Sequence, residues 1–406
     1  SPVVGFDYFK RPQNGEFMFW TPYESYAYDP ASTDFFNTLT SFTKASYIWA
    51  GSRVDEEESL ELFHTQNITP RLNFALGYKK AGTLGIYKQQ DSKTSGLSIN
   101  LNYLGDIYSA HAGFITNKIK GELNGGITND SLITNTVVDP NEHEVRLNNA
   151  TTALNKISGF LCQSVDLPLL SIGKINDSID NKLMTRLGHY FEYSKYGRHY
   201  KDDISSENTD FYSNFFYNDK QTFDSTSMQK IENRVFLHLH PLKQSVFFES
   251  LYGGIASKVY QFRSMSLGDT SYTADRANKQ ELSLYAGISA KYKDYFRWSA
   301  YGEYHIAGYK ANDVLLKGDL GVTLFPKSFP VDLLASGSIS NTTPDYFMEN
   351  FVSNHYRWQN NFDKTNEIRV EGKLSMSRIG LQAMVSQSVL TDPLYFDQTG
   401  IPRQHS

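Results

Sequence analysis

The stretch LSLYAGISAKYKDYFRWSAYGEYHI, residues 282–306, shows the pattern that organises the chain. Large apolar residues alternate with small or polar ones, and the alternation resumes after a short turn at Lys293 and Asp294. Because successive side chains of a β-strand point to opposite faces, a period of two indicates strands at 282–292 and 296–306. The stretch therefore predicts an antiparallel hairpin with one apolar face and one polar face.

The same alternation recurs along much of the chain. It predicts further strands at residues 71–79, 97–103, 316–325, 331–340, 367–376 and 379–389. Strands of soluble sheets average ~5–6 residues, whereas a membrane-spanning strand needs ~9–11, and most of these segments match the longer value. Between residues 165 and 265 the alternation slips, so the strands there are not defined. There is no run of about 18 apolar residues, which excludes a transmembrane helix.

The composition supports a membrane barrel. Phe, Tyr and Trp make up 14% of the 406 residues, yet the mean hydropathy is −0.46. A barrel with lipid outside and water inside requires this mixture, since lipid-facing and lumen-facing residues alternate. The 39 Lys and Arg against 44 Asp and Glu give a net charge of −5, which argues against a nucleic-acid partner. Aromatic residues near strand ends would form a girdle at the lipid headgroups: Tyr47, Trp49, Tyr78, Tyr103, Tyr108, Tyr292, Tyr295, Trp298 and Tyr309.

The connections between predicted strands fall into two classes. Short turns are expected at residues 69–70, 105–106, 293–294 and 326–330, and long polar loops at 79–95, 117–152 and 265–279. Short turns at one end and long loops outside the cell are typical of outer-membrane barrels. We therefore predict an all-β fold, a transmembrane antiparallel up-and-down β-barrel of roughly 14–18 strands.

Two segments have a less certain place in this barrel. The barrel would occupy residues 41–406. Residues 1–40, aromatic but not periodic, would form a first strand, a periplasmic extension or a lumen plug. The loop at 117–152 is long enough to fold into the lumen and narrow it.

Several motifs resemble the putative porin family of Bacteroidetes outer membranes. They are HTQNITPRLNF at 64–74, YSAH at 108–111, NGGITND at 124–130, GHYFEY at 188–193, FY at 211–212, TFDS at 222–225 and DPLYFD at 392–397. These motifs span most of the chain in the family's order. The resemblance implies a β-barrel in the bacterial outer membrane, in contact with its lipid, and it carries over no catalytic or ligand-binding residues.

The ends of the chain depart from the family's pattern. Family members are longer, and further strands normally follow the segment near Tyr395, whereas this chain ends at Ser406. Either the closing strands lie outside this sequence or the barrel closes differently. The first residues are not a signal peptide, so we expect an export signal to have been removed or left out.

Motifs for catalysis, cofactor or metal binding are weak. Gly125-Gly126 lacks the Lys-Ser/Thr of a phosphate loop, and no Gly-x-Ser-x-Gly elbow occurs. His238 and His240 share a strand face but have no third ligand, and the acidic run at 55–58 fits no calcium loop. The single cysteine, Cys162, lacks a patterned His or acid and is expected to be inert. We therefore predict no enzyme, no cofactor and no metal site.

Charged and titratable residues on the polar faces are the candidate lumen-lining residues: Arg297, Glu303, His305, Lys317, Asp319, Arg369, Glu371 and Lys373. In a membrane barrel they must face the lumen, since a charge on the lipid face costs ~2–4 kcal/mol at the midplane. Two interpretations stay open. The charges only hydrate the lumen or pair across strands, or they set the field of a water-filled pore, in which case their mixed signs predict weak ion selectivity.

Passive diffusion of small hydrophilic solutes is the function that this pattern favours. One alternative is a structural or assembly subunit that conducts nothing and contacts other outer-membrane proteins. Bulky residues on inward faces, such as Phe236, Phe325 and Tyr301, are mild evidence for it. The other alternative is a soluble cell-surface β-domain, in which the aromatic face would be a dry core.

Overall fold

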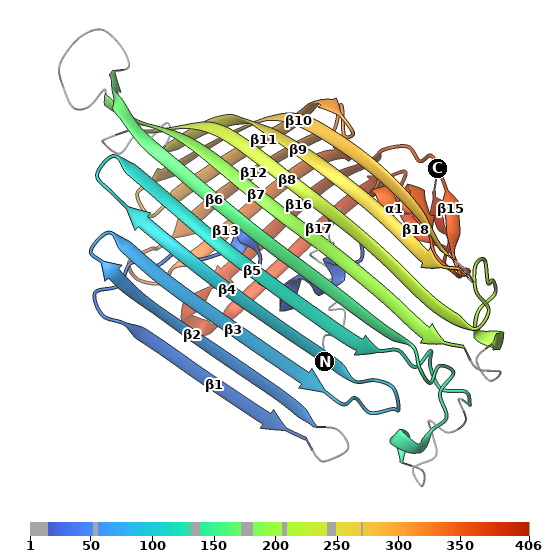
Figure 1. Ribbon diagram of the computed structural model, residues 1–406. Coiled ribbons are helices and arrows are strands. Elements are labelled where there is room, and N and C mark those ends of the chain that lie inside the picture. The colour runs from blue at the N-terminus through green and yellow to red at the C-terminus, as the bar shows by residue number, and fades with distance from the viewer. Residues whose placement is uncertain are drawn as a thin grey trace.

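A computed structural model describes residues 15–51, 56–129, 131, 139–171, 182–204, 209–241, 249–268 and 271–405. Fifteen strands form one antiparallel sheet in which each strand pairs with its neighbours along the chain (Figure 1). The strands are β1 (Phe42–Ala50), β2 (Glu57–Thr69), β3 (Leu72–Thr83), β4 (Ser92–Leu104), β5 (Tyr108–Glu122), β6 (Thr151–Ser171), β7 (Lys182–Asp203), β8 (Gln221–Pro241), β9 (Ser250–Leu267), β10 (Tyr272–Tyr292), β11 (Phe296–Gly308), β12 (Val314–Leu324), β13 (Val331–Thr342), β16 (Thr365–Met376) and β17 (Leu381–Thr391).

Short elements lie in the connections. Two strand pairs, β14 (Asn350–Val352) with β15 (Arg357–Gln359) and β18 (Leu394–Phe396) with β19 (Pro402–Gln404), stand apart from the large sheet. The helical turns are η1 (Thr21–Tyr26), η2 (Pro30–Ser32), η4 (Pro140–Glu142), η6 (Thr209–Phe211), α1 (Tyr346–Glu349) and η7 (Ser377–Ile379). Among the described residues, no helix has the length and apolarity needed to cross a membrane.

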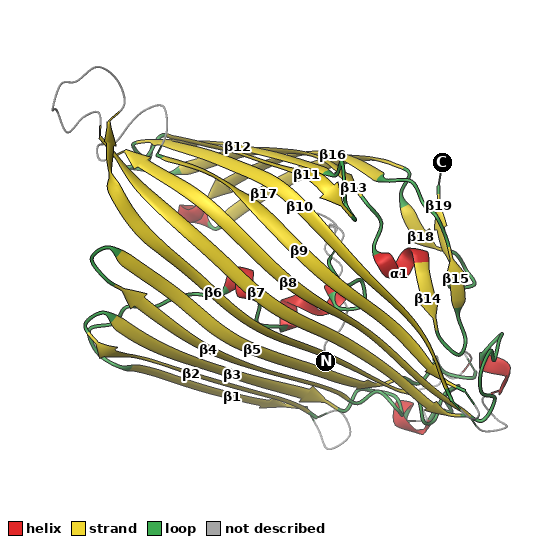
Figure 2. Ribbon diagram, turned by 45° about the horizontal axis from the view of Figure 1, so that its top comes forward, coloured by secondary structure: helices red, strands yellow, loops and turns green. Residues whose placement is uncertain are grey.

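The sheet curls around an interior that holds η1, η2 and α1 (Figure 2). Its two edges are β1 and β17, and no ladder joins them among the described residues. The predicted antiparallel up-and-down architecture is confirmed, with 15 strands in the sheet. The described sheet is open between β1 and β17. Both predicted alternatives, closing strands outside this sequence and a different mode of closure, are compatible with an open edge.

The longest strands are apolar on the outside over only part of their length. β6, β7, β8 and β10 contain 21, 22, 21 and 21 residues. On β8 the outward positions toward its end carry exposed apolar side chains, Ile231, Val235 and Leu237, whereas Ser227 and Gln229 precede them. Because a bilayer needs only ~9–11 residues of a strand, the polar half extends beyond the lipid.

The two ends of the sheet carry connections of different length. The three longest connections, residues 123–150, 204–220 and 343–364, lie at one end, the loop end; the other end, the turn end, carries connections of at most ten residues, such as 70–71 and 377–380. Since outer-membrane barrels place long loops outside the cell, the loop end is the outer end. The polar halves of the long strands lie at this same end, which agrees with their projection into water.

Three predicted loops are shorter than expected, and this is a correction. The loop predicted at 265–279 is wrong, because β9 runs to Leu267 and β10 begins at Tyr272. The loops at 79–95 and 117–152 shrink to residues 84–91 and 123–150. The added strand residues lie beyond the lipid, where both faces meet water or polar groups, so the alternation that reveals a strand is lost there.

Candidate functional site

The N-terminal segment, residues 15–41, runs along the inner face of the sheet. Residues 1–14 lie outside the described residues. Residues 15–40 contain no strand, so this part of the chain does not form the first strand that was one of the predicted alternatives. Asn117 of β5 holds the Tyr28 backbone on both sides: its Oδ1 accepts from Tyr28 N and its Nδ2 donates to Tyr28 O, each at 2.9 Å. Asn102 of β4 donates to Phe36 O at 2.7 Å. These contacts replace ladder partners that an irregular backbone lacks.

The β13–β16 connection, residues 343–364, forms a second layer on the inner face. Asp345 caps α1 by accepting from Phe347 N at 2.8 Å, and it also accepts from Met18 N at 3.1 Å. One carboxylate therefore joins this inner insertion to the N-terminal segment. Burial raises the pKa of Asp345 to about 6, although these two N–H donors favour its ionised form.

Asn354 anchors the inner insertion to β8 and to the loop before it. Its side chain is fully buried, accepts from the backbone N–H groups of Tyr217 and Asn218 and donates to Thr222 Oγ1. The next residue, His355, lies with its Nε2 2.7 Å from Thr222 Oγ1, and its ring stacks on Tyr212 at 3.6 Å. Burial lowers the pKa of His355, so its neutral form is favoured near neutral pH.

A layer of large side chains crosses the interior where the two inner segments meet the wall. We call this layer the partition: Phe17, Trp20, Ile119, Leu154, Tyr196, Met228, Tyr260, Phe262, Tyr346, Phe347 and Phe351. The Phe17 and Phe347 rings meet edge to face at 5.6 Å, and Phe262 stacks on Tyr346 at 4.4 Å. Rings packed in this way leave no room for water between them, so the partition is a dry core.

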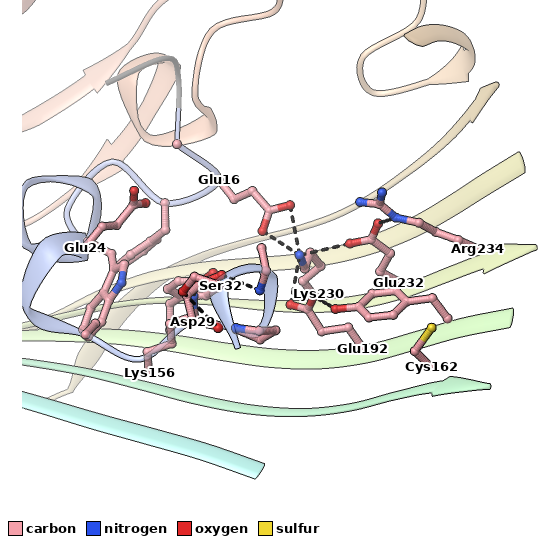
Figure 3. A pocket seen from close by; sticks show the side chains of 18 of the residues that line it. Glu16, Glu24, Asp29, Ser32, Lys156, Cys162, Glu192, Lys230, Glu232 and Arg234 are labelled. Atoms are coloured by element: carbon pink, nitrogen blue, oxygen red, sulfur yellow. Dashed lines mark hydrogen bonds and ion pairs between the residues drawn. The ribbon is translucent and has the colours of Figure 1, made fainter. Parts of the chain in front are cut away.

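An ion-pair cluster lies beside the partition. Lys230 of β8 is 6% exposed and has three carboxylates around its Nζ, those of Glu16, Glu192 and Glu232, at 2.8, 3.1 and 3.1 Å (Figure 3). Lys258 lies 3.4 Å from Glu281 and 3.8 Å from Glu16. Burial opposes ionisation of Glu16, but Lys230 and Lys258 outweigh it and hold its pKa well below the usual range.

Two cavities lie on opposite sides of the partition. The inner cavity, about 1010 Å³, extends toward the turn end and includes the Lys230 cluster and Cys162 (Figure 3). The outer cavity, about 1050 Å³, lies at the loop end. Neighbouring residues of one short turn separate them: Phe17 and Trp20 line the inner cavity, whereas Met18 and Phe19 line the outer one.

All eight predicted lumen residues share the inner face of the sheet. The strand registers place them on one face: Lys317 lies opposite Tyr301 of β11, and Arg369 lies opposite Ser338 of β13. His305 Nε2 lies 3.6 Å from Glu303 Oε1, Arg369 lies 3.3 Å from Glu371, and Asp319 accepts from Ser299 and Ser336. Whether Arg297, Glu303, His305, Lys317, Asp319, Arg369, Glu371 and Lys373 line a conducting pore stays a prediction.

The bulky residues predicted on inward faces have different outcomes. Phe236 lines the inner cavity, and Tyr301 donates to Glu303 at 2.8 Å. The inward placement of Phe325 is wrong: this residue follows the end of β12, has a φ of 52° and is 65% exposed. A turn residue with positive φ no longer obeys the alternation of the strand before it.

The candidate metal ligands form no metal site in the part of the chain that the structure describes. No three His, Cys, Asp or Glu residues are arranged there so that they could hold a metal ion. The rings of His238 and His240 lie 3.9 Å apart, and His238 Nε2 is 2.6 Å from Ser250 Oγ. In the acidic run, Asp55 lies outside the described residues, Glu56 accepts from Trp49, and Glu58 pairs with Lys80.

The partition and the Lys230 cluster are functional features that the sequence prediction missed. Residues 228–238 lie in the stretch where the alternation was considered lost. The signal there is Met228, Lys230, Glu232 and Arg234 at even positions, with apolar residues such as Val235 opposite them. Glu16, which completes the cluster, is 214 residues away from Lys230 and has no local signal.

An antiparallel sheet with an apolar outer band, a charged inner face and long loops at one end defines a class of protein, the outer-membrane β-barrel. Among solved structures, the siderophore receptor PirA from Acinetobacter baumannii is similar over 91% of this chain and 57% of its own, with 9% identity and a TM-score of 0.53. The ferric enterobactin receptor PfeA, in complex with BCV-L6, matches 87% of this chain and 54% of its own, with 9% identity and a TM-score of 0.49. The chain thus spans little more than half the length of these receptors.

The family comparison identifies the chain more closely. Residues 1–406 match the model of the family described as "Putative porin", and the chain belongs to that family. No curated protein matches it. Membership confirms the predicted putative porin family and the predicted outer-membrane location. The soluble surface domain considered as an alternative is therefore wrong.

Proposed function

We propose that the chain is a gated channel through which small hydrophilic solutes diffuse passively across the outer membrane. The observation that carries this proposal is the partition, a packed apolar layer that lies between the two cavities. Five of its side chains, those of Phe17, Trp20, Tyr346, Phe347 and Phe351, belong to the two inner segments and not to the large sheet. They can move without breaking a ladder of the sheet, so opening requires only the release of the inner segments.

The charges along the proposed path are mixed in sign. The inner cavity combines the acids Glu192 and Glu232 with Lys156 and Arg234. A lumen that carries both signs hydrates solutes without attracting one kind of ion strongly, so we expect weak selectivity. Outward apolar residues would contact the membrane lipid.

A non-conducting structural subunit is the second candidate, favoured by the same bulky packing. If the partition never opens, the chain would serve as a rigid body that contacts other outer-membrane proteins. The two candidates differ in what happens when the partition is weakened: only a channel should then conduct.

Single-channel conductance in a planar bilayer tests the proposal. The double variant Phe17→Ser, Trp20→Ser removes two rings from the partition, and Leu39→Ser is the control, because Leu39 lies in the same segment and is fully exposed. We expect rare openings from the unaltered protein, frequent stable steps from the double variant, and no change for Leu39→Ser. Silence from a correctly folded double variant would contradict the channel and support the structural subunit.

A further inference from the structure

The outer cavity contains an arginine whose charge has no partner. Arg198 of β7 lines this cavity, and among the described residues its guanidinium has neither a hydrogen bond nor a carboxylate within 4 Å. The neighbouring arginines of the inner face differ: Arg186 pairs with Asp166, and Arg234 pairs with Glu232. The half-buried guanidinium has no anion beside it among the described residues, so this position suits a ligand that supplies one.

Two aromatic rings hold the guanidinium of Arg198 in place. Its Cζ lies 4.8 Å from the centre of the Phe19 ring and 5.9 Å from that of Tyr200. Contact with ring faces orients the plane of the guanidinium and leaves its N–H edge available. Such an edge matches the two oxygens of a carboxylate, with which Arg forms paired hydrogen bonds.

The rest of the cavity wall offers flat apolar surface. Phe351 stacks on Trp358 at 4.8 Å, and Phe396 lies 6.3 Å from Trp358, all three lining the cavity. A ring of the ligand would pack against these faces with an offset or edge-on geometry. A concave site of this size, mostly apolar with a few polar groups, has the general form of a small-molecule site.

The acids of the cavity do not occupy Arg198. Asp224 also lines the cavity, but it is buried and accepts from Asn354 N at 2.9 Å, beyond ion-pair distance of the guanidinium. The exposed Arg357 adds a second guanidinium to the wall. The two arginines therefore balance the two acids that line the cavity, Asp224 and Glu122. Burial lowers the pKa of His355, whose Nε2 lies 2.7 Å from Thr222 Oγ1, so its uncharged form is favoured near neutral pH.

We propose that the outer cavity binds a small organic acid whose carboxylate pairs with Arg198 and whose flat, apolar ring lies against Trp358. The site is on the outer side of the partition and captures the acid from outside the cell. Binding of this kind goes beyond the proposed channel function and holds whether or not the partition opens.

Titration calorimetry on the full chain in detergent micelles tests the site with a matched pair of probes. 3-Phenylpropionate carries a ring and a carboxylate, and 3-phenylpropanamide has the same shape without the charge; titration into empty micelles is subtracted. We expect the acid to bind at least tenfold more tightly than the amide, since only the acid forms charge-assisted hydrogen bonds. Equal binding of the two probes, or binding of neither, overturns the proposal without any variant.

Two variants locate the site. Arg198→Lys keeps the charge but loses the planar fork, so it should weaken acid binding at least tenfold and leave the amide unchanged. Trp358→Leu should weaken both probes alike. Arg378→Gln is the control, because Arg378 is exposed at the turn end and, within the described residues, donates only to Ser328 O. Unchanged acid binding by Arg198→Lys would place the acid elsewhere and contradict the proposal.

Discussion

Lys230 shows how a buried charge is accommodated inside this protein. A lysine ammonium has three donors, and Glu16, Glu192 and Glu232 supply three carboxylates within 3.1 Å. Two of these acids belong to the strands β7 and β8, whereas Glu16 belongs to the N-terminal segment. Glu16 therefore holds the N-terminal segment to the wall by charge, as Asp29 of the same segment does through its ion pair with Lys156 of β6.

Replacing Glu16 should loosen the N-terminal segment without unfolding the sheet. In Glu16→Gln, Lys230 keeps two carboxylates and loses the third, so we expect the segment to open more easily by about 1–3 kcal/mol. Hydrogen–deuterium exchange of residues 15–36 measures this opening. Glu24→Gln is the control, since Glu24 lines the same cavity and has no ion pair with any residue that the structure describes. Equal protection in Glu16→Gln and the unaltered protein would contradict the role given to Glu16.

Asp345 makes the junction of the two inner segments sensitive to pH. Its pKa is raised from 3.8 to about 6, so the folded protein holds the proton more tightly than the unfolded chain. The junction is thus most stable below about pH 4, and its stability falls as the pH rises through about 6, by up to about 3 kcal/mol. Exchange rates of residues 343–349, corrected for intrinsic rates, should show this fall. Asp345→Asn should flatten the profile while Asp363→Asn leaves it unchanged, and a profile unaffected by Asp345→Asn would contradict this assignment.

At the scale of elements, the N-terminal segment fits the wall because two inward positions carry glycine. A Cβ added to Gly77 would lie 2.9 Å from Tyr28 Oη, and one added to Gly96 would lie 3.0 Å from Tyr28 Cδ2. Lys79 Nζ lies 4.4 Å from the centre of the same ring. The tyrosine thus rests on bare backbone and cannot do so beside a larger side chain.

Enlarging one of these glycines should displace the segment. Gly96→Val places branched carbon against the Tyr28 ring and Asn117 Oδ1, and overpacking of this kind costs about 1–3 kcal/mol. We expect faster hydrogen exchange at residues 26–30. Gly159→Ala is the control, because a Cβ there meets nothing within 4 Å. If Gly96→Val exchanges as the unaltered protein does, Tyr28 does not pack on β4.

Strands were predictable from the sequence where each has one face in lipid. The hairpin predicted at 282–306 corresponds to β10 and β11, and the strand predicted at 331–340 to β13 (Val331–Thr342). β7 and β8 escaped prediction because their outer halves have polar residues on both faces. The partition could not be predicted because it joins segments from both ends of the chain. A contact such as that between Phe17 and Phe347 produces no periodic pattern in the sequence.

At the scale of the whole molecule, the two cavities lie in series along the interior. The partition lies where the apolar outer band ends, since Met228 pairs with Phe262 next to the outward residues Gln229 and Gln261. In the proposed channel, a solute that crosses the partition would leave the outer cavity and enter the inner cavity. The one cysteine of the chain, Cys162, lines that inner cavity and so reports on whether current passes through it.

Modification of Cys162 should therefore block an opened channel. We expect a cationic methanethiosulfonate reagent, added to Phe17→Ser, Trp20→Ser channels in a planar bilayer, to lower the current in one step per channel. The mixed disulfide adds bulk and charge to the path, and a reducing agent should restore the current. The same channels with Cys162→Ser should not respond. An unchanged current with Cys162 present and modified, as mass spectrometry would show, would mean that ions avoid the inner cavity and cross elsewhere, for example between β1 and β17.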